Sequence, residues 1–377
     1  MASDSSRARV IRRVGNRVSV DTRLVPLLAG SLAICALAAV LQVSSGAYSM
    51  TRTTALRAVF DPAVWTDPAT IGRYLLGEGV ASALFGEASE LSIVTTVVWE
   101  LRLPRVIAAL IVGINLAISG AIFQAVTRNE LASPFILGVS SGAGLAIILT
   151  LLFFGSLIYL LPVFAALGGT VAFLLVYAIA WKGGTSPVRL VLAGVIVGTV
   201  FNSFQTGLFF VADDLGIVQG ALTWTTGSLT SVDWLLVRIG LLVTVGTVVL
   251  TIAGKRQLDL LLLGEETAGS LGMPVERVRF GLACVGILAA SISVAIAGIV
   301  GFVGLIVPHI VRTVAGTAHD RVVLGCLFVG PALLLAADVI ARLALSPAEI
   351  PVGIITGLVG GPYFLYLMRK RQQLGEL

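Results

Sequence analysis

The chain has 377 residues, of which 57% are hydrophobic and only 12% are charged, and its formal net charge is +5. A soluble globular domain carries about 25% charged residues, so this composition excludes a water-soluble protein. Apolar runs of about 20 residues, the length that crosses a bilayer as a helix, recur along the sequence. These runs are continuous, whereas a membrane β-barrel needs strands of about ten residues with alternating polarity. The predicted fold class is therefore an all-α membrane protein with several spanning helices.

Both ends of the chain carry basic residues. Residues 1–23 form a basic arm with six arginines, and Arg369, Lys370 and Arg371 follow the last apolar run. Positive charge gathers on the cytoplasmic side of membrane proteins, so both termini, including the tail 371–377, are predicted to be cytoplasmic. The first apolar run is longer than the core of a signal peptide, and we expect it to be retained as a helix.

The apolar runs give the predicted number of spans. Because both termini are expected on one side, this number must be even. The stretch 278–316 is too long for one crossing and contains three glycines and Pro308 as candidate break points, so it is interpreted as two spans. The predicted total is about ten, in chain order 24–43, 104–124, 134–154, 157–181, 188–211, 232–253, two within 278–316, 322–343 and 350–368.

The spans are predicted to form one transmembrane domain, residues 24–370, with two long loops. This threading puts 18 of the 25 lysines and arginines on the cytoplasmic side, as the positive-inside rule requires. The outer loop, 44–103, carries two Asp-Pro pairs and is expected to contain short surface helices, but the sequence does not reveal its function. The cytoplasmic loop, 254–278, combines short helical pieces with small residues and suits docking to a partner protein.

Few residues indicate covalent chemistry. The three cysteines, Cys35, Cys284 and Cys326, lie inside apolar runs without the spacing of a metal site or a disulfide framework, so buried structural thiols are expected. No GxxxxGK[ST] loop for binding ATP is present, so the energy for any transport must come from another chain. No nucleophile with a base and no HExxH pattern is found, which argues against an intramembrane enzyme. We therefore expect no catalytic residue, no metal and no cofactor bound by this chain.

Several ordered motifs make the chain recognisable. They are LRLPR at 101–105, RNELASP at 128–134, GSL at 227–229, GFVGLIVPHIVR at 301–312, PVG at 351–353 and GGP at 360–362. Over about residues 95–370 the chain resembles the FecCD (BtuC-like) permease family of ABC importers. One residue departs from the family pattern, because Glu130 stands where the family usually has proline after the asparagine.

This resemblance implies the fold of a type II ABC importer permease in the cell membrane. It implies that the subunit pairs with a second permease, either a copy of itself or a paralogue, and binds two ABC ATPase subunits that hold ATP and Mg²⁺. An extracytoplasmic binding protein would deliver the cargo. A ferric siderophore is the first expectation, with haem or cobalamin as alternatives, and no nucleic acid is expected among the partners.

Three arginines are predicted to receive the binding protein. Arg102, Arg105 and Arg342 lie at predicted outer ends of spans, where the positive-inside rule disfavours cations. In the family the matching arginines bind acidic residues of the binding protein. The alternative is that they anchor helices among lipid headgroups or pair with Glu100 and Asp338. Because Asp338 and Arg342 are four residues apart on one predicted helix, we expect them to pair and Asp338 to be structural.

The resemblance also implies a function for the cytoplasmic loop. It implies that the loop forms the coupling helices that fit a groove of the ATPase, and the alternative is a merely solvated loop. The candidate coupling residues are Gly264, Glu265, Ala268, Gly269, Leu271 and Gly272. It further implies a structural break at Pro308 and His309 near the inner end of a span.

Polar residues within spans are candidates to line a transport path. Amides that face lipid would lack hydrogen-bond partners, so such residues are expected to face a cavity or, equally, to bond between helices. The candidates are Asn115, Ser119, Gln124, Asn202 and Gln205. An ion-coupled secondary transporter is the rival interpretation, but it would normally place titratable groups at the membrane midplane, and Asp338 alone gives it little support.

Overall fold

The computed structural model describes residues 23–46, 48–182, 184, 186–212, 215–346 and 348–373, so most of the basic arm and the last residues of the tail lie outside the described residues. Within these ranges the regular structure is helical, with no strand longer than an isolated bridge. Seven helices are long and apolar enough to cross a membrane, and three shorter apolar helices bring the number to ten in the described ranges. The all-α fold and the predicted count of about ten spans are confirmed.

The ten apolar helices follow the predicted spans closely. They are α2 (Leu24–Ser44), α8 (Leu103–Thr127), α9 (Val139–Phe153), α10 (Leu161–Ala180), α11 (Pro187–Val211), α13 (Trp234–Ala253), α16 (Val275–Ala297), α17 (Val303–Ala315), α18 (His319–Leu343) and α19 (Val352–Gln373). A short 3₁₀ turn, η2 (Gly155–Leu160), precedes α10. One helix was not expected, because α12 (Leu215–Thr226) follows α11 where the sequence was interpreted as a connection.

The predicted outer loop is largely helical. It contains α3 (Arg52–Val59), α4 (Pro62–Trp65), α5 (Pro68–Leu76), α6 (Glu78–Phe85), α7 (Ile93–Thr96) and the π-helical turn η1 (Val97–Arg102). The two Asp-Pro pairs explain two of these helices. Asp61 and Asp67 each accept a hydrogen bond from a backbone N–H of the following turn, and the proline after each aspartate occupies the first helical position, where its missing N–H costs nothing.

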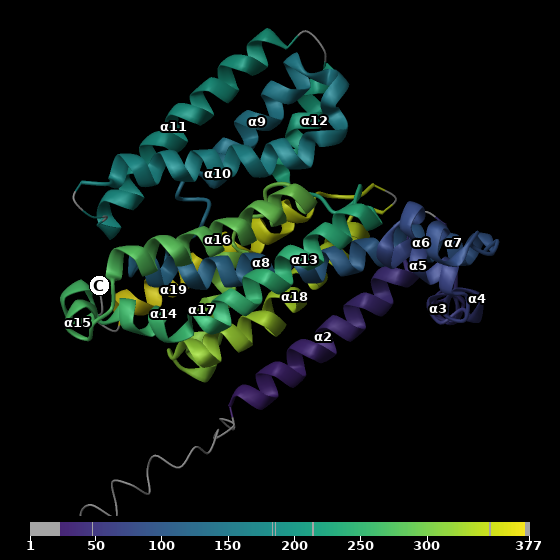
Figure 1. The fold of residues 1–377 in the computed structure, drawn as a ribbon, viewed down its shortest axis with the longest axis horizontal. Coiled ribbons are helices and arrows are strands. Elements are labelled where there is room, and N and C mark those ends of the chain that lie inside the picture. The colour runs from purple at the N-terminus through teal and green to yellow at the C-terminus, as the bar shows by residue number, and fades with distance from the viewer. Residues whose placement is uncertain are drawn as a thin grey trace, which may run out of the picture.

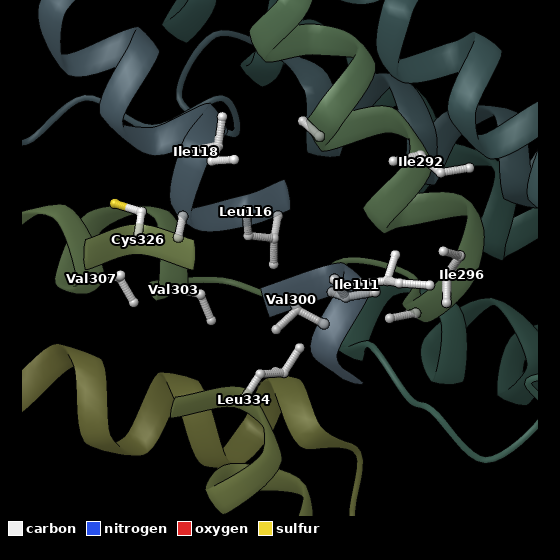
Figure 2. Close-up of a cluster of buried hydrophobic side chains, with 14 of the residues drawn as sticks. Ile111, Leu116, Ile118, Ile292, Ile296, Val300, Val303, Val307, Cys326 and Leu334 are labelled. Atoms are coloured by element: carbon white, nitrogen blue, oxygen red, sulfur yellow. The ribbon is translucent and has the colours of Figure 1, made fainter. Parts of the chain in front are cut away.

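Helix α8 is the centre of the main helix group. Its most apolar stretch is 83% buried, whereas that of α11 is 22% buried. Figure 1 shows α13, α16, α17 and α18 around α8, while α9, α10, α11 and α12 form a second group that packs on the first mainly through α10 and α16. The apolar core joins α8, α16, α17 and α18, as the side chains of Ile111, Ile296, Val303 and Leu334 show in Figure 2.

Two glycine pairs allow α8 to touch its neighbours backbone to backbone. A Cβ atom on Gly120 would lie 1.8 Å from the carbonyl oxygen of Gly304 on α17. A Cβ atom on Gly113 would lie 2.6 Å from the carbonyl oxygen of Gly330 on α18. Such contacts replace the hydrophobic effect, which does not drive helices together within lipid.

The break in the stretch 278–316 confirms two of the predicted break points and contradicts the other two. It lies at Gly298 to Phe302, which includes the candidate glycines Gly298 and Gly301, and both Gly298 and Phe302 have a positive φ. The other candidates, Gly304 and Pro308, lie inside α17. Proline removes the hydrogen bond to the carbonyl four residues earlier, that of Gly304. The side-chain amide of Gln124 on α8 donates to this carbonyl oxygen at 3.2 Å, so the helix can continue through the proline.

The cysteine prediction was only partly right. All three cysteines are free thiols, but only Cys326 is fully buried, at 0% exposure. Cys35 on α2 and Cys284 on α16 are partly exposed. Both helices present part of their apolar surface to the surroundings, so position within an apolar run did not guarantee burial inside this chain.

Candidate functional site

The predicted docking and coupling residues gather at the two ends of the helix bundle. The first is the α3–α7 end, which also contains the C-terminus of α2 and the first turn of α8. The second is the α14–α15 end, named for α14 (Lys255–Leu262) and α15 (Glu265–Ser270), which lie on the predicted cytoplasmic loop. Figure 1 shows α14 and α15 at the opposite end of the bundle from α5 and α6.

Glycines shape α15 at both of its ends. Gly264 separates α14 from α15 with a φ of +98°, and Gly272 follows α15 with a φ of +82°. Side chains rarely adopt such angles, so glycine is needed at both turns. Leu258, Leu261 and Ala268 are buried at 0–3% exposure and hold the two helices against the bundle.

The remaining predicted coupling residues form an accessible surface. Glu265, Gly269, Leu271 and Gly272 are exposed, and Gly264 is half-buried. Leu271 is 62% exposed although it belongs to a connecting segment and not to a spanning helix. An apolar side chain displayed beside small residues on such a segment fits contact with another protein.

An ion pair at Arg279 and hydrogen bonds at His319 tie α15 and α14 to spanning helices. The guanidinium of Arg279 on α16 is 1% exposed and donates to Glu265 of α15 at 2.6 Å and to Glu276 at 2.9 Å. The ring Nδ1 of His319, the first residue of α18, lies 2.8 Å from a carboxylate oxygen of Asp259 on α14, and the His319 N–H donates to the same oxygen. Any shift of these short helices is therefore transmitted directly to α16 and α18.

Sequence reasoning missed these ties. Neither His319 nor Arg279 is among the functional residues predicted from the sequence. A signal was available for the arginine, because a cation within the first turns of an apolar run must find a partner. Nothing in the sequence indicated which of the nearby carboxylates would supply it.

Two of the three predicted docking arginines cap helix α2. The last carbonyls of a helix lack partners within it and carry partial negative charge. Arg102 donates to the carbonyl oxygen of Val43 at 2.6 Å, and Arg342 donates to that of Gln42 at 3.0 Å. These contacts fasten the C-terminus of α2 to α8 and α18.

The third, Arg105, forms the most buried ion pair of the α3–α7 end. It is 5% exposed and donates to both carboxylate oxygens of Asp338 on α18 at 2.9 Å, and to Glu349 at 2.6 Å. The side-chain amide of Gln42 also donates to Asp338. The expected pairing of Asp338 with Arg342 is therefore wrong. Arg342 lies 3.2 Å from Glu349 instead.

Glu349 is the accessible member of this cluster. Its side chain is 28% exposed, whereas that of Asp338 is 1% exposed. Burial alone would raise the pKa of Glu349, but the hydrogen bond from Arg105 and the charges of Arg105 and Arg342 lower the pKa below its usual value. Glu349 thus stays ionised and pairs with the guanidiniums of two predicted docking residues, Arg105 and Arg342. Glu100, the other expected partner, pairs with Arg73 at 3.1 Å.

Three of the predicted path residues bond between helices. Asn115 is fully buried, donates to Thr244 on α13 at 2.6 Å and accepts from Thr247 at 3.0 Å. Ser119 donates to the carbonyl oxygen of Gly286 on α16 at 2.7 Å. The side-chain amide of Gln124 donates to the carbonyl oxygen of Gly304 on α17, and the side-chain oxygen of Gln124 accepts a hydrogen bond from Arg312. All three side chains therefore lie where α8 contacts a neighbouring helix.

The other two lie on the exposed half of α11. Gln205 is partly buried and donates to the carbonyl oxygen of Ser141 on α9 at 3.0 Å and to the side chain of Asn202 at 3.1 Å. Asn202 itself is exposed. It belongs to a polar stripe along α11 that also contains Thr199, Ser203 and Thr206, all of them exposed.

The hydroxyl groups of this stripe are already satisfied. Thr199, Ser203 and Thr206 each donate to the backbone carbonyl four residues earlier, at 2.8 to 2.9 Å. The neighbouring helix α12 repeats the pattern, because Thr223 donates to the carbonyl of Gln219. The hydroxyl oxygens can still accept hydrogen bonds, so such a surface tolerates water, but its hydroxyl donors are not free to hold a solute.

Known proteins resemble the chain along most of its length. The model of the FecCD transport family matches residues 34–370. The chain belongs to the FecCD transport family. It is 38% identical to the iron(3+)-hydroxamate import system permease protein FhuG of Bacillus subtilis, over 73% of this chain and 84% of that protein. It is 40% identical to the vitamin B12 import system permease protein BtuC of Vibrio cholerae, over 72% of this chain and 82% of that protein.

A solved structure supports the same assignment. An inward-facing metal-chelate type ABC transporter is 28% identical, with a TM-score of 0.75 over 92% of this chain and 99% of that chain. This FecCD protein is therefore a membrane permease of an ABC importer and not an enzyme. Within the described ranges, no group of three or more His, Cys, Asp or Glu side chains could hold a metal ion.

The buried pair of Arg105 and Asp338 predicts a strong coupling in stability. Arg105→Gln leaves Asp338 buried without its main partner, so we expect a loss of about 3–5 kcal/mol. The double variant Arg105→Gln/Asp338→Asn removes both charges and is expected to recover much of that loss. Thermal unfolding in detergent measures the two single variants, Arg105→Gln and Asp338→Asn, and the double variant.

The exposed pair of Arg73 and Glu100 serves as the control. Its side chains are 40% and 38% exposed, so Arg73→Gln is expected to cost at most about 1 kcal/mol. Additive losses for Arg105→Gln and Asp338→Asn would contradict the structural interpretation of the buried pair.

Proposed function

We propose that this chain is the permease subunit of an ATP-driven importer for a ferric siderophore delivered by an extracytoplasmic binding protein. The observation that carries the mechanism is the exposed surface of α15, which is tied by Arg279 to α16. Two separate ATPase subunits, which hold ATP and Mg²⁺, would bind this surface. Their movement would reach the spanning helices through the ion pair at Arg279 and the hydrogen bonds between His319 and Asp259.

The proposed orientation puts the α14–α15 end and both termini in the cytoplasm. Arg128, at the end of α8, lies beside Gly264. The connection between α10 and α11, with Lys182 and Arg189, approaches Glu276 at the start of α16. Several basic loop residues therefore gather around α14 and α15, which supports a cytoplasmic location for this end.

A bulky residue on α15 tests the ATPase contact. A Cβ atom on Gly269 meets nothing within 4 Å, so Gly269→Trp should fold normally. We expect it to reduce at least tenfold the ATPase subunit that co-purifies with the tagged permease from its native membranes, because the indole would occupy the contact surface. Co-purified ATP hydrolysis and mass spectrometry of the subunit provide the measurement.

The matched control is Gly79→Trp on α6, which also has open space around its Cβ position but lies at the opposite end. This variant should retain the ATPase. If Gly269→Trp retained as much ATPase as Gly79→Trp, α15 would not be the coupling surface.

We propose that the binding protein docks at the α3–α7 end. Arg105 and Arg342 share Glu349, which holds the position that an acidic residue of the binding protein would take. Docking would then exchange one carboxylate for another, at little electrostatic cost. Arg102 is 2% exposed, so its proposed contribution is to hold α2 in place beneath the contact.

This exchange predicts that the binding protein docks more tightly when Glu349 is removed. Glu349→Gln should lower the concentration of cargo-loaded binding protein needed for half-maximal transport by several-fold, measured in vesicles that contain the permease and its ATPase. The control Glu90→Gln removes one exposed negative charge from the same end without a contact to these arginines. Equal effects of the two variants would show general electrostatics and would refute the exchange.

The polar stripe on α11 is the proposed wall of the transport path. Asn202 lies well inside the spanning helix, where an amide that faced lipid would lack partners. We infer that the path lies between this stripe and a second permease subunit, either a copy or a paralogue. On α19, Gly357 and Gly361 have no neighbour within 4 Å of an added Cβ among the described residues, which leaves room for a helix of that second subunit.

The cargo is the least constrained part of the proposal, since relatives named for iron(3+)-hydroxamate and vitamin B12 are similarly close to this chain. A ferric siderophore is proposed first and cobalamin second. Uptake of labelled ferric hydroxamate, ferric catecholate, haem and cobalamin by a deletion strain decides between them. We expect loss of uptake of one iron chelate only. Normal iron uptake with impaired cobalamin uptake would overturn the siderophore assignment and leave the importer mechanism intact.

A further inference from the structure

A deep apolar groove opens on the side of the molecule at the α3–α7 end. Its volume is about 320 Å³, and nearly all of its lining atoms are apolar. It lies between α5, the first turns of α8 and one face of α13. The lining residues are Val59, Trp65, Ile71, Tyr74, Leu75, Trp99, Leu103, Ile107, Trp234, Val237, Arg238 and Leu241.

The groove continues the membrane-facing surface of the protein. From Trp234 to Leu241 it follows α13 for about 10 Å, at the 1.5 Å rise per residue of a helix. Helix α13 is a spanning helix whose side chains Leu235, Leu242 and Val249 are more than half exposed. The groove therefore extends from the membrane interface into the depth of one lipid leaflet.

Aromatic rings give the groove a fixed apolar floor. Trp99 stacks with Tyr74 at 5.1 Å and with Trp234 at 6.2 Å between ring centroids. The indole N–H groups donate to backbone carbonyls, from Trp99 to Ala58 at 3.0 Å and from Trp234 to Trp99 at 2.6 Å. With the indole N–H groups bonded, the rings offer carbon surface to the groove, as aromatic residues do at membrane interfaces.

One polar group beside the groove still has hydrogen-bonding capacity. Arg238 uses its Nη1 to donate to the carbonyl oxygens of Arg73 and Tyr74, at 3.3 and 3.1 Å. No hydrogen bond from its Nη2 or Nε is found within the described part of the chain, so its charge can serve an anion. The hydroxyl of Tyr74 is buried and so is not open to a ligand in the groove.

We propose that this groove binds a membrane phospholipid, with one acyl chain on the tryptophan floor and the phosphate at Arg238. The surface beside the groove supports this occupant, because α5 and α6 expose Leu75, Leu76, Leu84 and Phe85, which a lipid surface would cover. The lipid would join the α3–α6 segment to α13.

Two lipid probes test the proposal on the purified full-length chain. Native mass spectrometry in mild detergent measures the binding of phosphatidylglycerol and of diacylglycerol with the same acyl chains. We expect one tightly held phosphatidylglycerol per chain and at least tenfold weaker binding of the diacylglycerol, which lacks the phosphate. Arg238→Gln should abolish this difference, while Arg238→Lys should restore part of it.

Neighbouring leucines provide a matched pair for the acyl-chain contact. Leu241→Trp places an indole in the groove and should abolish binding of both lipids. Leu242→Trp makes the same change at a side chain that is 77% exposed and does not line the groove, so it should bind as the parent does. Equal binding of the two lipids by the parent, or equal retention by Leu241→Trp and Leu242→Trp, would overturn the proposal. If Leu241→Trp fails to fold, the Arg238 variants still decide it.

Discussion

Inside a bilayer every polar group must find its partner within the protein, and this constraint explains most of the specific contacts in the chain. Asn115, Ser119 and Gln124 project from one helix, and each bonds to a different neighbouring helix. These contacts have direction, unlike apolar packing, so they fix the rotation of α8 against α13, α16 and α17. Together with the glycine contacts at Gly113 and Gly120, they make α8 the reference to which the other helices of the main group are aligned.

The buried arginines at the two ends of the bundle are neutralised in different ways. At the α3–α7 end, the guanidiniums of Arg102, Arg105 and Arg342 are neutralised by carboxylates or by the end of α2, which leaves only Glu349 accessible. At the α14–α15 end, Arg279 is buried, but its partner Glu265 is 44% exposed on a short helix. The first arrangement stabilises a rigid platform. The second keeps a surface helix attached to α16 while it remains open to a partner.

Much of the fold could be predicted from the sequence, because bilayer length and loop charge leave little freedom in the order of the spans. The short helical pieces predicted for the loop 254–278 are present as α14 and α15, and the coupling role of α15 stays a prediction. The polar residues were harder. A lone Asn or Gln in an apolar run shows that a partner is needed, but not whether that partner is a helix, a second subunit or water. Asn115 and Asn202 carry the same signal in sequence and have opposite surroundings in the structure.

Other differences have specific physical causes. Pro308 looked like a break because proline removes a backbone hydrogen bond, yet Gln124, 184 positions earlier in the chain, supplies the missing donor. The spacing of Asp338 and Arg342 suggested a pair within one helix, but Arg105 offers two parallel hydrogen bonds to the carboxylate, a better match than a single contact. Helix α12 escaped notice because it is only 12 residues long, too short to be read as a span.

The satisfied hydroxyls on α11 and α12 have an evolutionary consequence. If this stripe forms the wall of the path, the wall contains few groups that would have to change when a lineage acquires a different cargo. Selection for a new nutrient could then act on the gene of the delivering protein alone, while the permease gene is inherited nearly unchanged. Relatives named for chemically unrelated nutrients could in this way be similarly close to this chain in sequence.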